Sequence, residues 1–255
     1  MLQTTVRAVY LLMTSNKTLV ALQFNYANRS LEENFKTLKR LIVKTPDNAI
    51  VLAPELCLSG YKYDSLEESS QFSKQILDEI KELSTCKTIA LTLIEKDGAN
   101  FFNTLKIFHH GKLVQSRAKA KLFPIGEEEK YFTSGKIDDI EIIEIDGIKI
   151  ATLICFELRF TDLWQKILGA DVILVPSYWG KLRKEHLKSL SQALGIANQA
   201  FVIVANSSDE DMASSSAIIT PFGDVYRDDS SFIVSHKIDL NEIKKMRRYI
   251  DIGLR

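Results

Sequence analysis

Residues 49–61 read AIVLAPELCLSGY, an apolar run that passes directly into a loop with one acidic side chain. A short apolar run without polar alternation is typical of a strand that is buried on both faces, as in the centre of a parallel sheet. Glu55 stands just beyond the run, and α/β sheets usually bind ligands at the ends of such strands. The segment therefore predicts a central strand with a candidate functional residue at its end.

The flanking segments alternate between strand and helix patterns. Upstream, LVALQF (19–24) predicts a strand, and Ser30 with Glu33 forms a capping-box pattern that opens a helix ending near Pro46. Further helices are expected at 66–83, 161–168, 182–198 and 240–248, strands at 88–94, 101–108, 112–118, 141–145, 148–154, 171–175, 201–205, 217–220 and 232–238, and hairpin turns at His110-Gly111 and Asp146-Gly147. This alternation predicts one α/β domain with mixed sheets.

Composition excludes several classes of protein. The 255 residues carry 33 basic and 33 acidic side chains, so the basic excess of a nucleic-acid-binding protein is missing. No apolar stretch approaches the roughly 18–20 residues of a membrane span, and AVYLLM (8–13) is shorter than the apolar region of a signal peptide. Three cysteines, and four histidines without zinc-site spacing, predict a reduced chain with no metal or cofactor. We expect a cytoplasmic protein that binds neither nucleic acid nor membrane.

Two other predicted strands also end in reactive types of side chain. KAKLFP (119–124) follows the strand at 112–118, and CFELRF (155–160) follows the apolar run IKIATLI. Taken alone, Lys119 reads as a surface residue, and Cys155 is as compatible with a packed thiol as with a reactive one. The positive end of the helix expected from residue 161 favours a thiolate at Cys155.

Together, Glu55, Lys119 and Cys155 in this order resemble the nitrilase superfamily of carbon–nitrogen hydrolases, nearest its ω-amidase and aliphatic-amidase branches. The matching segments are PELCLSGY (54–61), KAKLFP (119–124), GEEEKYFTSG (126–135), CFELRF (155–160), VPSYW (175–179), IANQAFVIVAN (196–206) and SAIITPFGDV (216–225). The resemblance covers 18–255 and implies a four-layer α-β-β-α sandwich that forms a homodimer or a higher homo-oligomer. Residues 1–17 form an N-terminal extension, in which Met13 is an alternative start to Met1.

Two positions depart from the family pattern. Lys121 stands where the family usually has the histidine of K-x-H-L-F, and LGIANQ (194–199) lacks the arginine and glutamate of R-A-x-E-N-Q. The second departure implies a change in scaffold or assembly. The second glutamate that many members carry matches Glu128, with Glu127 and Glu129 as the alternative registers.

The resemblance also implies a mechanism. Cys155 attacks an amide carbon and forms a thioester, and Glu55 serves as the general base. Partial burial is the expected means of raising the pKa of Glu55 toward neutrality. Lys119 and the backbone N–H of Phe156 stabilise the oxyanion, while Glu128 positions the substrate or the base.

Several other residues have open or structural readings. Tyr178 and Trp179 are equally compatible with a pocket wall and with the core, and Asn206 is a weaker strand-end candidate. Glu157 and Arg159 are expected to form a salt bridge at a helix start rather than to bind substrate.

The remaining cysteines and the histidine pair have structural readings. Cys57 and Cys86 are expected to be structural, and His109-His110 to mark a solvated turn.

The leading hypothesis is hydrolysis of a small linear amide to a carboxylate and ammonia. An N-carbamoyl amine or amino-acid hydrolase with the same triad is the alternative enzyme. A catalytically silent family member that serves as a binding module is the alternative of a different class. The intact set of three residues argues against the silent member.

Overall fold

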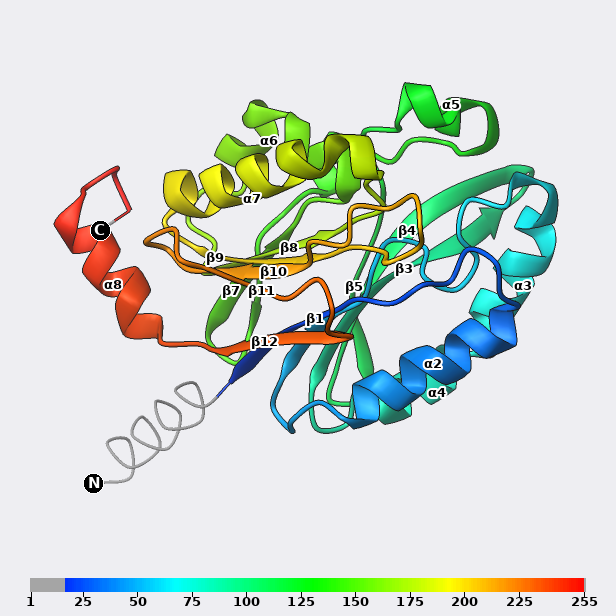
Figure 1. Cartoon of the computed structure of the whole chain (residues 1–255), viewed down its shortest axis with the longest axis horizontal. Coiled ribbons are helices and arrows are strands. Elements are labelled where there is room, and N and C mark those ends of the chain that lie inside the picture. The colour runs from blue at the N-terminus through cyan, green and yellow to red at the C-terminus, as the bar shows by residue number, and fades with distance from the viewer. Residues whose placement is uncertain (1–16, 255) are drawn as a thin grey trace.

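The computed structural model describes residues 17–254, so the expectations for the extension, apart from Lys17, and for the start at Met1 or Met13 lie outside the described residues. Two six-stranded mixed sheets pack face to face, and helices cover both outer faces (Figure 1). The α/β class and the four-layer α-β-β-α sandwich are thereby confirmed.

The two sheets share one plan, with three parallel strands at the centre and antiparallel strands at the edges. The first sheet has the order β12-β1-β2-β3-β4-β5 and the second β11-β10-β9-β8-β7-β6. The strands of the first are β1 (Thr18–Leu22), β2 (Ile50–Leu52), β3 (Thr88–Asp97), β4 (Asn100–His109), β5 (Lys112–Ala118) and β12 (Ile233–Lys237). Those of the second are β6 (Ile143–Ile145), β7 (Ile148–Thr152), β8 (Val172–Pro176), β9 (Phe201–Ala205), β10 (Ala217–Ile219) and β11 (Val225–Arg227).

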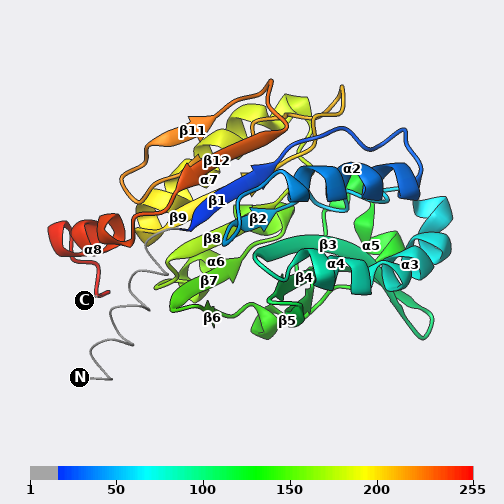
Figure 2. The same cartoon turned by 90° about the horizontal axis from the view of Figure 1, so that it is seen from below.

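The helices lie on opposite sides of this sandwich (Figure 2). The first sheet is covered by α2 (Leu31–Val43), α3 (Leu66–Gln75) and α4 (Leu77–Leu83), and the second by α6 (Thr161–Lys166) and α7 (Lys184–Asn198). The one-turn helix α5 (Glu128–Tyr131) follows β5, and α8 (Leu240–Tyr249) follows β12. Within residues 17–254, no helix combines the length and the apolar character needed to cross a membrane.

The central strands are apolar throughout because both of their faces are buried. In β1, Leu19 and Ala21 point into the core between the sheets, whereas Val20 and Leu22 point into the core beneath the helices. The same alternation recurs in β2. Each strand therefore contributes to two cores, which explains the continuous apolar runs in the sequence.

Helix α2 forms as its sequence predicts. Ser30 Oγ accepts from the Glu33 backbone N–H at 3.2 Å, and Glu33 Oε2 accepts from the Ser30 N–H at 3.0 Å. The single helix expected at 66–83 was wrong, because the regular helix is interrupted at Ile76 and divides into α3 and α4. Ile76 is itself buried in the core under these helices, so packing against the sheet decides the break.

Candidate active site

The three strand-end residues converge where the two sheets meet. Glu55 follows β2 and Lys119 follows β5 in the first sheet, while Cys155 follows β7 in the second. Glu55 and Lys119 are fully buried, and Cys155 is 7% exposed. Residues separated by up to 100 positions in the sequence thus form one cluster at the strand ends.

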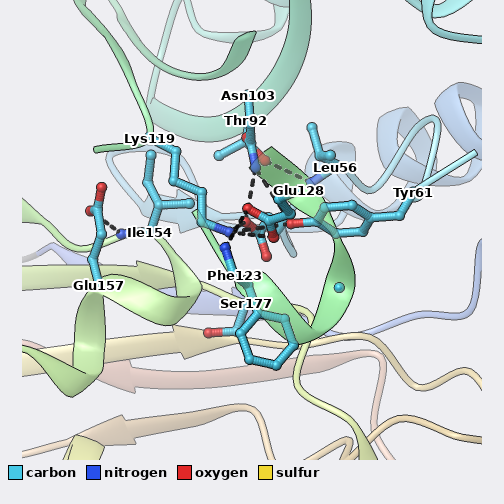
Figure 3. A network of polar contacts seen from close by, with 12 residues as sticks. Leu56, Tyr61, Thr92, Asn103, Lys119, Phe123, Glu128, Ile154, Glu157 and Ser177 are labelled. Carbon is cyan, nitrogen blue, oxygen red and sulfur yellow. Dashed lines mark hydrogen bonds and ion pairs between the residues drawn. The ribbon is translucent and has the colours of Figure 1, made fainter. Parts of the chain in front are cut away.

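Lys119 lies at the centre of this cluster between two carboxylates. Its Nζ is 2.8 Å from Glu55 Oε1 and 2.8 Å from Glu128 Oε1 (Figure 3). Burial acts to lower the pKa of Lys119, but Glu55, Cys155 and Glu128 together raise it above its ordinary value. Lys119 is therefore a permanent positive charge in the site.

Glu55 is held rigidly and keeps one oxygen free. Its backbone N–H donates to Ser177 O at 3.2 Å, and its carbonyl accepts from the Tyr26 hydroxyl at 2.6 Å. Oε1 accepts from Lys119 and, at 2.9 Å, from Asn103 Nδ2. Oε2 is buried and has no hydrogen-bond partner within residues 17–254. This free oxygen is the part of Glu55 that can accept a proton.

Cys155 occupies a strained turn rather than a helix start. It opens the 3₁₀ turn Cys155–Arg159 with φ +49°, a left-handed conformation that is uncommon for non-glycine residues. Burial and the charge of Glu55 raise the pKa of its thiol well above the ordinary value, while Lys119 and the Tyr178 backbone N–H oppose this rise. Helix α6 begins at Thr161, as expected, but burial outweighs the effects that would favour a thiolate at Cys155. A proton acceptor beside Cys155 would therefore assist its ionisation.

The second glutamate is Glu128. It is 2% exposed, whereas Glu127 and Glu129 are exposed, because the left-handed turn at Glu127 directs the next side chain inward. Its second carboxylate oxygen accepts from the Phe123 backbone N–H at 3.1 Å. Burial raises the pKa of Glu128, and Lys119 opposes that rise.

The expected salt bridge between Glu157 and Arg159 is absent. Glu157 pairs with Arg117 of β5 instead, through contacts of 2.7 and 3.1 Å between the guanidinium and the carboxylate. Both side chains are almost completely buried. Arg159 stacks over the Trp179 ring, 4.6 Å from its centroid, and lines the pocket. The expectation failed because Arg117, which is distant in sequence, binds both oxygens of the Glu157 carboxylate.

The buried Glu157 carboxylate joins the two loops that carry Lys119 and Cys155. It accepts from the backbone N–H of Ala120 at 2.7 Å and from that of Ile154 at 2.7 Å. Each of these amides is adjacent in sequence to one of the two reactive residues. Figure 3 shows Glu157 and Ile154 beside Lys119.

A pocket of about 270 Å³ opens onto Cys155. Its lining includes Tyr61, Tyr63, Phe123, Glu128, Cys155, Tyr178 and Arg183. Arg159 and Trp179 line an adjoining hollow that shares Cys155. Within residues 17–254, neither Arg159 nor Arg183 is paired with a carboxylate, and Arg183 lies over the Phe123 ring at 5.1 Å. The pocket therefore presents two cations whose charges are left for a ligand.

Tyr178 and Trp179 serve both as pocket wall and as core. Tyr178 packs beside Tyr61 with 5.4 Å between ring centroids, and Trp179 is 4% exposed. Asn206 lies behind them, where its side chain accepts from the Trp179 N–H at 2.8 Å and donates to the Trp179 carbonyl at 3.2 Å. Asn206 thus positions the wall and does not line it.

Phe156 and Lys121 both lie among aromatic rings at the edge of the site. The Phe156 ring packs against Phe123 and Phe160, with centroid distances of 5.1 and 5.2 Å. Lys121 stands over Phe160 at 4.8 Å, so the side chain that replaces the family's histidine packs on an aromatic face.

Sequence reasoning missed Asn103, Tyr61 and Arg183. Asn103 is a buried polar residue within the apolar segment FFNTLKIF of β4, and that interruption was a usable signal. Tyr61, whose hydroxyl is 3.4 Å from Lys119 Nζ, closes the segment that Glu55 opens. Arg183 gave no signal, because one arginine near a helix start is ordinary.

This fold, with a thiol, a carboxylate and an ammonium group at the shared ends of its strands, defines a hydrolytic enzyme of the α-β-β-α sandwich class. The chain belongs to the carbon–nitrogen hydrolase family, whose model matches residues 18–248.

Several relatives of this chain are named as amidases. The chain is 30% identical to the 2-oxoglutaramate amidase of Bacillus subtilis, over 92% of this chain and 95% of the relative. It is 26% identical to the ω-amidase of Mus musculus, over 80% and 81% of the two chains. Among solved structures, Nit3 of Saccharomyces cerevisiae, a nitrilase-superfamily member, superposes with a TM-score of 0.79 at 21% identity, over 94% of this chain and 97% of that one. The protein is therefore an enzyme of the amidase type.

Proposed function

We propose that the protein hydrolyses the terminal amide of a small linear carboxylic acid to a carboxylate and ammonia, through a thioester on Cys155. The observation that carries this proposal is the buried Glu55–Lys119 ion pair beside a thiol at the floor of the pocket. One group can accept a proton, one can stabilise an oxyanion, and one can attack carbon. These are the three requirements of acyl transfer by a thiol.

Acylation begins with the protonated thiol. Glu55 Oε2 takes the proton of Cys155 as the sulfur bonds to the amide carbon, and the carbonyl electron pair moves to oxygen. The Lys119 ammonium and the Phe156 backbone N–H stabilise this oxyanion, and loss of one such donor typically costs about 10²–10³ in rate. When the oxyanion collapses, the C–N bond breaks and Glu55 returns the proton to the nitrogen, so that ammonia leaves.

In deacylation, water is the nucleophile and the Cys155 sulfur is the leaving group. Glu55 removes a proton from a water molecule that attacks the thioester, and Lys119 again stabilises the oxyanion. The C–S bond breaks and the sulfur recovers the proton from Glu55. One amide and one water have then become one carboxylic acid and one ammonia. Glu128 supports both steps by holding the other side of the Lys119 ammonium at 2.8 Å.

The pocket favours a substrate with a negative charge at the end away from the amide. Arg159 and Arg183 line the space next to Cys155, and neither has a carboxylate partner among residues 17–254. Guanidinium groups bind carboxylates strongly and in fixed geometry. A volume of about 270 Å³ suits a short molecule. The amidase relative that acts on 2-oxoglutaramate supports the same class, the amide of a short dicarboxylic acid.

The test is ammonia release from three matched panels: monoamides of short dicarboxylic acids, neutral aliphatic amides of equal length, and N-carbamoyl amino acids. We expect the first panel to give the highest kcat/KM, Cys155→Ala to abolish turnover, and Cys57→Ala to preserve it, because Cys57 is buried in a separate core.

Each other result has a definite meaning. Preference for carbamoyl substrates, with release of carbon dioxide, would replace the proposal by the carbamoyl hydrolase. Absence of turnover and of iodoacetamide labelling at Cys155 would favour a silent binding member.

A further inference from the structure

Two hairpins, one from each sheet, meet at the end of the sandwich away from the pocket. The turn between β4 and β5 contains His110 (φ +47°), and the turn between β6 and β7 contains Asp146 (φ +50°). Strand β4 contacts the site at Asn103 and reaches this end at His109. Six residues of strand span roughly 20 Å, so the meeting point of the hairpins is separate from Cys155.

Three donor groups come together at this meeting point. One donor atom each from His109, His110 and Asp146 lie within 4.8 Å of one another. His109 Nε2 is 3.3 Å from Asp146 Oδ1, and the two imidazole rings are 3.9 Å apart between centroids. Such spacing needs only small side-chain rotations to bring all three groups onto one ion.

His110 is held in the form that binds metals. Its Nδ1 is 2.9 Å from the Thr85 carbonyl oxygen. A carbonyl only accepts, so Nδ1 carries the hydrogen and Nε2 presents a lone pair on an exposed ring. A backbone carbonyl that holds the second ring nitrogen is the usual outer partner of a metal-binding histidine.

His109 has a comparable outer partner. Its Nδ1 is 3.0 Å from Thr88 Oγ1, a hydroxyl that can accept a hydrogen bond and leave Nε2 for an ion. The His109 side chain is 12% exposed, whereas His110 is exposed in the turn, so the expected solvated turn holds for His110 and not for His109.

Asp146 supplies a charged oxygen. Lys17 Nζ binds Oδ2 at 2.8 Å, which leaves Oδ1 on the side of His109. The neighbouring Lys17 ammonium reduces the affinity of this carboxylate for a further cation and favours reversible binding.

We propose that His109, His110 and Asp146 form a site for a divalent transition metal of the zinc and cobalt type. Two imidazoles and one carboxylate form a donor set suited to such ions, and the exposed side of His110 leaves a coordination position for solvent. The ion links the two hairpins and so ties the first sheet to the second. The sequence predicted no metal because its histidines and cysteines lack the close spacing of zinc motifs. In the folded chain, the donors are brought together from two different sheets.

The experiment uses the full chain without an affinity tag, carrying Cys155→Ala and Cys86→Ser so that accessible thiols do not compete. Titration with Co²⁺ is followed by absorption and titration with Zn²⁺ by calorimetry. We expect one equivalent to bind, cobalt bands without thiolate character, and an unfolding temperature that rises with metal concentration.

Single substitutions locate the ion. His110→Ala on the exposed turn should weaken binding at least tenfold and remove the thermal shift, as should Asp146→Asn. His236→Ala, the matched control, should leave both unchanged. Full binding by His110→Ala, loss of binding by His236→Ala, or no bound metal in the parent would overturn the proposal. These readouts are made on a protein that lacks Cys155, so they are independent of the amidase function.

Discussion

In the proposed mechanism the reactive residue is the Cys155 thiol, whose pKa depends on its neighbours. Glu55 and Lys119 act on Cys155 in opposite directions, the first raising and the second lowering the thiol pKa. Because the thiol pKa is raised, the proposed mechanism has Glu55 take the proton as the sulfur attacks. This proposed order of events differs from that of thiol enzymes that hold a preformed thiolate beside a cation.

Replacing Glu55 should separate thiol ionisation from catalysis. Glu55→Gln removes the negative charge that raises the thiol pKa, so the pKa of Cys155 should fall. Turnover should nevertheless drop by about 10³ or more, because the base is gone. The thiolate absorbance of Glu55→Gln, measured against pH and referenced to the same variant with Cys155→Ala, gives the pKa. Lys119→Met should move it upward. An unchanged pKa in Glu55→Gln would show that the carboxylate does not act on the thiol.

Arg183 should determine affinity for anionic substrates. Arg183→Met removes the guanidinium that lies over the Phe123 ring and keeps an unbranched side chain at this position. A charged hydrogen bond of about 1.5–3 kcal/mol predicts a KM about 10- to 100-fold higher for the monoamide of a dicarboxylic acid. The KM for a neutral amide of equal length should not change. Equal losses on both substrates would contradict a carboxylate contact.

At the scale of elements, the site depends on two loops that belong to different sheets. The loop after β5 carries Lys119 and the loop after β7 carries Cys155. Both donate backbone amides to the Glu157 carboxylate, which Arg117 of β5 holds from the other side. This network is the direct polar link between the ammonium loop and the thiol loop.

Breaking the link should reduce both stability and turnover. Glu157→Gln leaves the buried Arg117 charge without a carboxylate partner, which predicts a loss of about 3–5 kcal/mol in unfolding free energy. Urea unfolding measures this loss, and kcat should fall in variants that still fold. Lys96→Gln is the control, because it breaks an exposed ion pair with Glu67 that is worth about 1 kcal/mol or less. A loss for Glu157→Gln no larger than that of the control would refute the link.

At the scale of the whole molecule, the expected association into a dimer or larger homo-oligomer needs an exposed apolar surface. One candidate face lies where α8 and the turn before β11 meet. Tyr249 is 80% exposed there, and Phe222 and Ile250 are each 47% exposed. Phe222 and Tyr249 line the same surface hollow.

A negative charge on this face should dissociate the expected homo-oligomer. Light scattering after gel filtration should give at least twice the mass of one chain for the parent and mainly monomer for Tyr249→Asp, because a buried unpaired carboxylate is costly. Val43→Asp is the matched control, because it places the same charge on an exposed apolar position of α2, and it should not dissociate the protein. A monomeric parent, or dissociation by both variants, would contradict the use of this face.

Local patterns predicted most of the elements. The capping box of α2, the His110-Gly111 and Asp146-Gly147 hairpins and the apolar central strands all form where the sequence places them, because caps, turns and alternation act over a few residues. The break at Ile76, the short β11 and the 3₁₀ turn at Cys155 were not predicted, because packing against the sheets decides them.

The sequence by itself determined the strand ends at which Glu55, Lys119 and Cys155 stand, and with them the family, because strand-and-loop motifs are local. Only the tertiary structure decided which carboxylate pairs with which cation. It placed Glu157 on Arg117 rather than on Arg159, selected Glu128 from three adjacent glutamates, and brought His109 and His110 to Asp146. These contacts join different sheets or depend on the direction of one turn. Sequence separation therefore carries little information about them, and the free energy of burying each charge selects the partner.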